Sequence, residues 1–238
     1  MKDIENWLGV HEKEAIERLK AFCRLPSVST DPAFTLDVRR TAEFTASQLE
    51  KAGFPSVEII ETKGHPSIIG EWCDVPDAPT ILIYGHYDVQ PPDPLEKWNS
   101  SPFEPVICDD RLYARGVSDD KGPLSIPIEV VAAFHEVRGE LPINIKVIIE
   151  GEEESGSPHF AGTVERLKDR LACDLVISAD GAMWRADLPS MTVASRGLVA
   201  LEVSVQGAHK DLHSGRHGGS APNAIRALTR MLASMHDD

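Results

Sequence analysis

Cysteine is scarce in this sequence, and its distribution argues against disulfide or metal-thiolate chemistry. The 238 residues include 4 cysteines, and no two of them form a C-x-x-C pair. Close cysteine pairs are typical of zinc-thiolate and dithiol redox sites, so neither is indicated here. We expect reduced and mostly packing side chains at all four positions, which are Cys23, Cys73, Cys108 and Cys173.

Long apolar runs and clusters of positive charge are also missing. No run approaches the roughly 20 apolar residues of a membrane span. Residues 1–6 lack the apolar stretch of a secretory signal peptide. The formal net charge is −14, with 24 basic against 38 acidic residues, and there is no basic block. This balance argues against nucleic acid or an anionic membrane as a partner, and we expect a cytoplasmic protein.

The composition that remains is that of an ordinary globular protein, 42% apolar and 26% charged. Short runs rich in Val and Ile indicate buried strands, and longer amphipathic runs indicate helices. Their alternation predicts an α/β fold. The expected strands are 57–61, 67–71, 80–84, 143–149 and 174–178, and the expected helices are 12–24, 37–52, 123–138 and 160–171.

Two further segments interrupt or end this alternation. A long ordered loop is expected at 91–112, where a proline-rich start is followed by aromatic residues. After Met191 the pattern changes, and residues 198–205 alternate apolar with polar side chains as a half-exposed antiparallel strand does. With a helix expected at 222–235, this part predicts the opening of a second domain.

Acidic and histidine clusters punctuate the central part of the chain. Three of them directly follow a predicted strand, and ligands collect outside the carboxyl ends of the strands in an open α/β sheet. The sequence therefore predicts that an imidazole and several carboxylates gather at one edge of the sheet, as in a metal site. The four clusters are 85–88, 118–122, 152–156 and 178–181.

The first cluster pairs a histidine with an acid. His86 and Asp88 are two residues apart, so in extended backbone they point the same way, and the carboxylate can hold the imidazole through its second nitrogen. The alternative is a surface turn. Within 118–122, the pair Asp119-Asp120 has a similar alternative as a helix N-cap.

The third cluster places three adjacent carboxylates after a buried strand. Glu152, Glu153 and Glu154 repel one another where solvent is limited, and a cation would neutralise part of that charge. One of them could bind metal while a neighbour, its pKa raised, accepts a proton from water. An exposed acidic turn is the alternative. Taken alone, Asp180 and His213 are typical of surface groups. The prediction of a site rests on all the clusters together. Their mixed N and O donors suit zinc, manganese or cobalt better than calcium.

The clusters and their surroundings resemble a known family, the dinuclear zinc peptidases. The resemblance covers nearly the whole chain, in order. This family includes carnosine-type dipeptidases, aminoacylases, acetylornithine deacetylase, succinyl-diaminopimelate desuccinylase and glutamate carboxypeptidase, and the dipeptidase branch is the most similar. The matching stretches are 85–91, Trp98 with 102–105, 115–122 and 150–157.

The resemblance implies a role for seven residues. The metal ligands would be His86, Asp119 and Asp180 for one ion, with Asp119 bridging to a second ion that Glu154 also binds. Glu153 would be the general base, and Asp88 would orient the imidazole. His213 would reach into the site of a neighbouring subunit, which implies a homodimer. The family also often has a cis peptide bond directly after the residue that corresponds to Asp119, and we predict one here.

The implied fold is a three-layer α/β sandwich with a mixed, mostly parallel sheet of the phosphorylase/hydrolase-like kind. Residues 1–193 would form the N-terminal part of the catalytic domain, and residues 194–238 would begin a smaller α+β lid or dimerisation domain. Family members are longer, so we expect this chain to be the N-terminal part of such a protein. The last histidine ligand of the second ion and an arginine-bearing substrate site would then lie beyond Asp238.

The implied activity is metal-dependent hydrolysis of the amide bond of dipeptides or small peptides. Two Zn²⁺ ions, or Mn²⁺ or Co²⁺, would activate water beside the Glu153 base. A deacylase acting on N-acyl amino acids is the alternative within the family. A shortened chain that binds metal without catalysis is the alternative outside the enzyme class.

Overall fold

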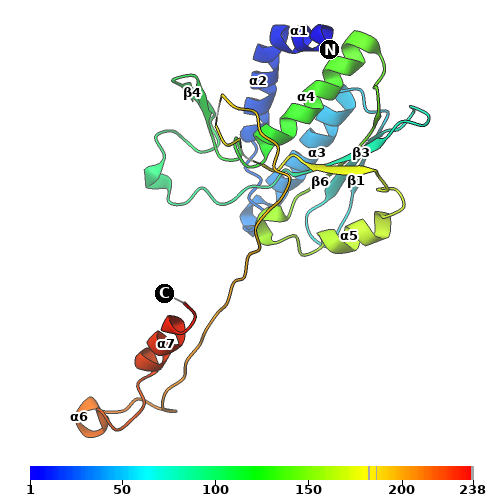
Figure 1. The fold of residues 1–238 in the computed structure, drawn as a ribbon. Coiled ribbons are helices and arrows are strands. Elements are labelled where there is room, and N and C mark those ends of the chain that lie inside the picture. Colours follow the sequence, from blue (N-terminus) through cyan, green and yellow to red (C-terminus); the bar gives the residue numbers. More distant parts are fainter. Residues whose placement is uncertain (182, 186, 237–238) are drawn as a thin grey trace. The chain divides into compact units, whose positions relative to one another are not determined.

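The computed structural model describes residues 1–181, 183–185 and 187–236, and these form two compact units, Met1–Met191 and Thr192–Asp238. The first unit holds five α-helices and seven strands among its described residues (Figure 1). The helices are α1 (Lys2–Val10), α2 (Glu12–Cys23), α3 (Thr35–Lys51), α4 (Lys121–Arg138) and α5 (Phe160–Leu167). The strands are β1 (Ser56–Ile60), β2 (Ser67–Trp72), β3 (Thr80–His86), β4 (Val106–Cys108), β5 (Arg111–Tyr113), β6 (Asn144–Glu150) and β7 (Leu175–Ser178).

One five-stranded sheet forms the centre of this unit, in the order β1-β2-β6-β3-β7. Strand β2 is antiparallel to β1 and to β6, whereas β3 is parallel to β6 and to β7. All strands except β2 therefore run in one direction, and the sheet is mixed. In register, His86 pairs with Glu150 and Tyr84 pairs with Ser178. The carboxyl ends of β6, β3 and β7 consequently lie side by side.

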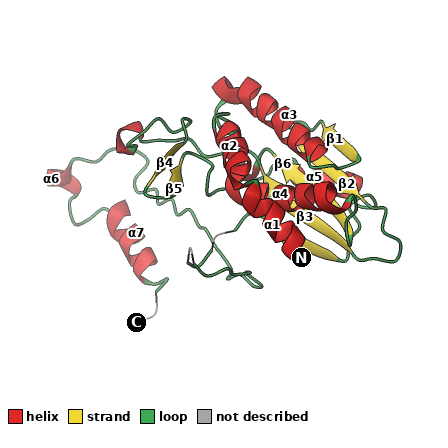
Figure 2. Cartoon of the chain, turned by 90° about the horizontal axis from the view of Figure 1, so that it is seen from above, coloured by secondary structure: helices red, strands yellow, loops and turns green. Residues whose placement is uncertain are grey.

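Helices cover both faces of the sheet, which confirms the predicted three-layer α/β sandwich (Figures 1 and 2). Alternate residues of each strand point to opposite faces. Ile68, Ile83 and Ile149 therefore pack with α1, α3 and α4 in the larger core, while Ile69 and Ile148 pack with the α5 side. Buried apolar surface on both faces is what makes these strands read as continuous Val- and Ile-rich runs.

Most predicted elements are present, with three differences in the first unit. Helix α1 was not predicted. The helix expected at 160–171 ends at Leu167. The predicted loop at 91–112 contains an antiparallel pair, β4 with β5. Its two-residue turn, Asp109-Asp110, has φ values of 49° and 58°, and such paired positive φ angles are typical of hairpin turns formed by Asp, Asn or Gly.

The second unit contains two helices among its described residues, α6 (Ser214–His217) and α7 (Ala224–Ala233). Helix α7 begins where the Asn223 side chain accepts a hydrogen bond from the Arg226 amide at 3.1 Å, as an N-cap does. The strand predicted at 198–205 is wrong, because these residues form no ladder in the described chain. Alternating polarity makes a strand only where a second strand supplies hydrogen-bond partners.

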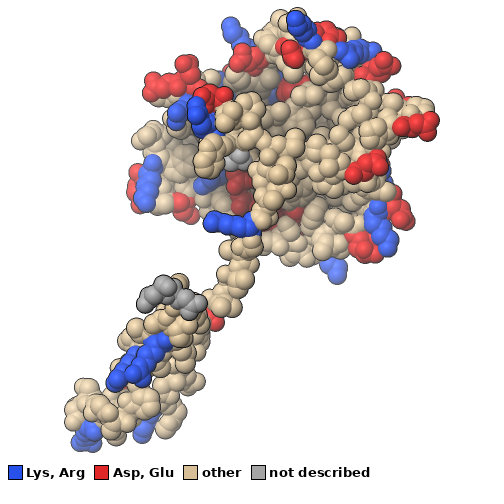
Figure 3. Space-filling view, in the orientation of Figure 1, with Lys and Arg blue, Asp and Glu red and all other residues tan. Residues whose placement is uncertain are grey.

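None of the described helices combines the length with the apolar character needed to cross a bilayer. On the face of the first unit shown in Figure 3, Lys and Arg side chains are interspersed with Asp and Glu.

The core of the first unit predicts a matched pair of stability effects on α3. Leu49 is fully buried, whereas Leu36 is 71% exposed. Truncating a buried leucine removes apolar burial and leaves a cavity. We expect Leu49→Ala to lower the free energy of unfolding by about 2–5 kcal/mol and Leu36→Ala to change it by less than about 0.5 kcal/mol. Urea unfolding followed by circular dichroism measures both, and equal effects would contradict this core assignment.

Candidate metal centre

The carboxyl ends of the central strands bring together three of the residues singled out by the sequence. His86 is the last residue of β3, Asp180 follows β7, and Asp119 lies on the loop before α4. One ligand atom from each of these side chains lies within 4.8 Å of the others. His86 Nε2 is 3.0 Å from Asp119 Oδ1 and 3.9 Å from Asp180 Oδ2. The imidazole is fully buried, whereas the two carboxylates are partly exposed, so the group opens toward solvent.

The opposite edge of the imidazole faces Asp88. His86 Nδ1 lies 3.1 Å from the Asp88 carbonyl oxygen and 3.3 Å from Asp88 Oδ1. The buried Asp88 carboxylate accepts hydrogen bonds from Ser29 Oγ at 2.6 Å and from the backbone amides of Glu153 and Glu154 at 3.3 and 3.1 Å. Asp88 therefore links the imidazole to the turn that follows β6.

The carboxylates around His86 control its charge. Burial lowers the pKa of the imidazole, but the hydrogen bond and charge of Asp88, together with Asp120 and Asp119, outweigh it and raise the pKa to about 10. A cluster that holds a proton this firmly is one in which positive charge is strongly stabilised. The same carboxylates would stabilise a metal cation bound at this imidazole in place of the proton.

Glu153 and Glu154 lie on a one-turn 3₁₀ helix, Glu153–Ser155. Glu153 Oε2 is 4.0 Å from His86 Nε2. The Glu154 carboxylate accepts a hydrogen bond from Gln90 Nε2 at 2.8 Å and is not part of the compact three-residue group found among the described residues. Burial raises the pKa of both glutamates, and neighbouring carboxylates add to the rise while His86 opposes it.

The loop that carries Asp119 is tightly constrained. Its predicted cis peptide bond, Asp119–Asp120, is present. The glycines that flank the pair allow close backbone approach: a Cβ on Gly122 would lie 2.0 Å from the Val117 carbonyl oxygen, and Gly116 has a φ of +85°. The loop therefore accepts only glycine at these two positions without strain.

Several polar residues next to this group were not predicted. Asp120 is buried and accepts a hydrogen bond from the His86 amide at 3.0 Å; burial raises its pKa to about 7. Lys121 is also fully buried, and burial lowers its pKa to about 7. A lysine or a second aspartate beside a glycine carries no sequence signal for burial, so only packing reveals them.

Two more unpredicted contacts hold the strand ends. Tyr84 Oη and Ser157 Oγ donate to Glu150 Oε1 at 2.8 and 2.9 Å. Glu152, the first of the three adjacent glutamates, pairs with His159 Nδ1 at 3.0 Å. Glu152 is thus turned to a different partner from Glu153 and Glu154.

His213 lies in the second unit. Its side chain is exposed, and Nδ1 accepts a hydrogen bond from the Gly215 amide at 3.1 Å, capping α6. The role implied for it by the family resemblance stays a prediction.

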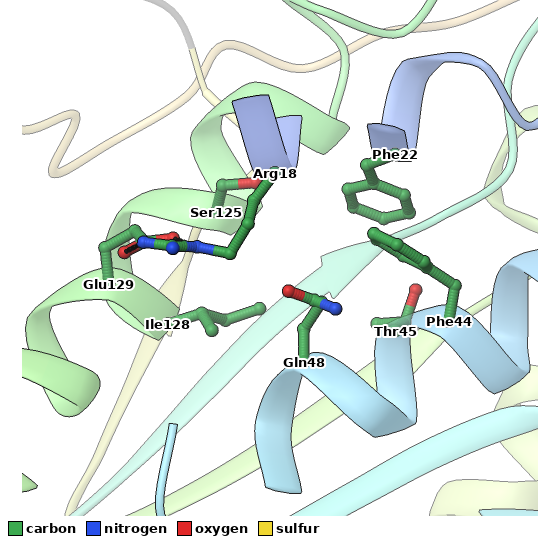
Figure 4. A pocket seen from close by; sticks show the side chains of 8 residues that line it. All are labelled: Arg18, Phe22, Phe44, Thr45, Gln48, Ser125, Ile128 and Glu129. Atoms are coloured by element: carbon green, nitrogen blue, oxygen red, sulfur yellow. Dashed lines mark hydrogen bonds and ion pairs between the residues drawn. The ribbon is translucent and has the colours of Figure 1, made fainter. Parts of the chain in front are cut away.

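A cavity in the helical layer is separate from this group (Figure 4). It is bordered by α2, α3 and α4, and the Arg18 guanidinium donates to Glu129 Oε1 at 2.8 Å on its wall. None of His86, Asp119 and Asp180 lines it. The lining side chains are Arg18, Phe22, Phe44, Thr45, Gln48, Ser125, Ile128 and Glu129.

The donor set of His86, Asp119 and Asp180 fits a transition-metal ion. A neutral imidazole nitrogen with two carboxylate oxygens is a common ligand combination for zinc, and manganese or cobalt accept it too. The imidazole is oriented from behind by a carboxylate, as metal-bound histidines usually are. His86, Asp119 and Asp180 are therefore the residues that would hold the ion.

Comparison with known proteins agrees with this architecture. The family model for peptidase family M20/M25/M40 matches residues 82–229. The chain belongs to this family. Among relatives, human Beta-Ala-His dipeptidase is 30% identical over 100% of this chain and 50% of its own length. The Cys-Gly metallodipeptidase DUG1 of Saccharomyces cerevisiae is 31% identical over 92% of this chain and 49% of its own length.

Solved structures of the M20 peptidase family share the fold. The dipeptidase Dug1p from Saccharomyces cerevisiae superposes with a TM-score of 0.76 at 27% identity, covering 100% of this chain and 53% of its own. Human carnosine dipeptidase 1 gives a TM-score of 0.74 at 28% identity, covering 100% of this chain and 53% of its own. The chain thus spans about half the length of the relatives that it matches.

Proposed function

We propose that this chain forms part of a metal-dependent dipeptidase that hydrolyses the amide bond of dipeptides or small peptides. The observation that carries the proposal is the compact group of His86, Asp119 and Asp180 with the Glu153 carboxylate beside it. The names of the M20-family relatives, Beta-Ala-His and Cys-Gly dipeptidases, support the substrate class.

The proposal gives each ligand the role that the family resemblance implies. His86, Asp119 and Asp180 would hold one ion, and Asp88, at Nδ1 of His86, would orient the imidazole ring. Glu154, which accepts a hydrogen bond from Gln90, would bind a second ion together with Asp119, a role that the family resemblance implies. Bound divalent metal supplies Lewis acidity, which lowers the pKa of water and polarises a carbonyl oxygen.

Glu153 moves the proton in this proposal. Its carboxylate lies beside the ligand group, and burial with neighbouring negative charge raises its pKa. A carboxylate with a raised pKa is a better proton acceptor near neutral pH. Glu153 takes a proton from the attacking water and then passes it to the amine that leaves when the amide bond breaks.

The finer features of the proposal rest on chemistry and resemblance. Zinc is proposed as the ion because the N and O donors suit it. A homodimer in which His213 helps to polarise the scissile carbonyl is proposed for the full-length protein. The net charge of −14 supports small-molecule substrates rather than nucleic acid or membrane as partners, and a cytoplasmic location is proposed with them.

The metal content of the chain tests the proposal. After incubation with Zn²⁺ and gel filtration, plasma mass spectrometry should find a single tightly held ion per chain, because the three-residue group is complete and Glu154 lies outside it. A chain with no retained metal would contradict the proposed centre. Two retained ions would show that a second site is completed by this chain or by a partner copy, and hydrolysis of β-Ala-His and Cys-Gly would then be assayed directly.

A further inference from the structure

Lys121, the first residue of α4, is buried in an unusual way. Its side chain is fully buried, and its Nζ donates to two backbone carbonyl oxygens, those of Leu25 at 2.7 Å and Phe22 at 3.1 Å. It also lies 5.1 Å from the centre of the Phe22 ring. Burying an amine away from water is unfavourable unless it is well bonded. A buried methionine or leucine would fill the space without that cost, so packing alone does not account for a lysine.

Of the two carbonyl groups that accept from Lys121, that of Phe22 lies in the last turn of α2, which ends at Cys23, and that of Leu25 lies two residues beyond it. This end of a helix carries partial negative charge and carbonyl oxygens that lack partners within the helix. The Lys121 amine therefore binds the beginning of α4 to the end of α2, two elements that are about 100 residues apart in the chain.

The same residue closes the loop that carries Asp119. The Lys121 amide donates to the Gly116 carbonyl oxygen at 3.0 Å. The stem of its side chain runs along Gly116, where an added Cβ would lie 3.1 Å from Lys121 Cδ. One residue earlier, Asp120 accepts from the His86 amide. The loop is thus attached to β3 through Asp120 and to α2 through Lys121.

Asp119 depends on these attachments for its position. Its carboxylate is 59% exposed, unlike the fully buried imidazole that it faces. An exposed side chain has little packing of its own to hold it. Apart from its 3.0 Å contact with His86 Nε2, the position of the Asp119 carboxylate therefore depends on the backbone that carries it. That backbone is anchored by the two neighbouring residues.

We propose that Lys121 is a positioning residue for Asp119, and that its bonds to the Phe22 and Leu25 carbonyl oxygens hold the Asp119 carboxylate at ligand distance from His86. The inference rests on the proposed function only in that the His86 group must bind metal. Lys121 itself does not touch the ion or the substrate.

The test is Lys121→Met, which keeps an unbranched stem and removes the amine. We expect the affinity for Co²⁺, measured by titration against a competing chelator, to fall about 10- to 100-fold, the range seen when a residue that orients a ligand is lost. The visible absorption spectrum of bound Co²⁺ should change as well, because the geometry of its oxygen ligands changes. Wild-type affinity with a wild-type spectrum would overturn the inference.

A control variant separates positioning from general destabilisation. Val131 is 2% exposed in the core on the same helix α4, so Val131→Ala should lower the melting temperature while leaving Co²⁺ affinity and spectrum unchanged. If Val131→Ala weakens Co²⁺ binding as much as Lys121→Met does, the effect is one of stability and the inference fails.

A second variant covers the case in which Lys121→Met does not fold. Lys121→Gln keeps an N–H donor on a shorter stem, and we expect an intermediate loss of Co²⁺ affinity with an altered spectrum. An unaltered spectrum and affinity in this variant would also overturn the inference. Failure of the wild-type chain to bind Co²⁺ would instead remove the proposed metal centre, so the two failures are distinguishable.

Discussion

Replacing His86 with alanine is expected to lower the affinity of the chain for Zn²⁺ at least about 100-fold. Changes to residues that only orient a metal ligand cost about 10- to 100-fold, and His86 is the single nitrogen donor of the three-residue group. Its removal leaves Asp119 and Asp180, two oxygen donors that are partly exposed and that water can solvate. Competition titration with a chromophoric chelator measures the change.

The matched control for this experiment is His135→Ala. His135 is an exposed histidine that contacts the Trp72 ring edge-on, with ring centroids 5.5 Å apart. It does not belong to the group of His86, Asp119 and Asp180. Its loss should leave Zn²⁺ affinity within about twofold of wild type, because distant surface changes have little effect on a site. Equal losses in the two variants, or retained Zn²⁺ binding by His86→Ala with a native circular dichroism spectrum, would place the metal elsewhere.

Glu153→Gln is expected to reduce kcat for dipeptide hydrolysis about 10²- to 10⁴-fold in the catalytically active protein, the usual contribution of a general base. Glutamine has nearly the same shape but cannot accept the proton from water. The metal should stay bound, because Glu153 lies outside the three-residue group. Initial rates with a dipeptide substrate, together with metal content by plasma mass spectrometry, measure both properties.

Glu152→Gln is the control for that variant. The same substitution is made one residue away, at a carboxylate that is paired with His159 and has no place in the proposed mechanism. We expect kcat to stay within about threefold of wild type, with any loss confined to stability, since a weakened ion pair affects folding rather than proton transfer. Full activity in Glu153→Gln would show that another group moves the proton.

Strand order and sheet polarity explain why much of the site could be predicted. The apolar runs before His86, Glu152 and Asp180 were recognisable as buried strands, and parallel strands present their carboxyl ends at the same edge. The observed register, with His86 beside Glu150 and Tyr84 beside Ser178, brings those ends together. Each predicted strand, with the polar residues that follow it, was therefore enough to predict which side chains gather at this edge of the sheet.

Other features depend on contacts between segments that are distant in the chain. The strand predicted at 198–205 does not form, because alternation of side chains cannot supply a partner strand. The pairing of Glu152 with His159 could not be predicted either, because the sequence does not distinguish the three adjacent glutamates and only the conformation of the turn gives each side chain its own partner.

The sequence by itself determined the α/β class of this protein and the residue types at its acidic edge, because periodicity and composition are local properties. Its family resemblance pointed to Asp119 rather than Asp120 as a ligand. Only the tertiary structure shows the contacts of the residues that follow Asp119: Asp120 is buried and accepts a hydrogen bond from the His86 amide, and Lys121 donates to the Leu25 carbonyl oxygen just beyond α2. Burial and long-range hydrogen bonds arise from packing between distant segments, and no local pattern records them.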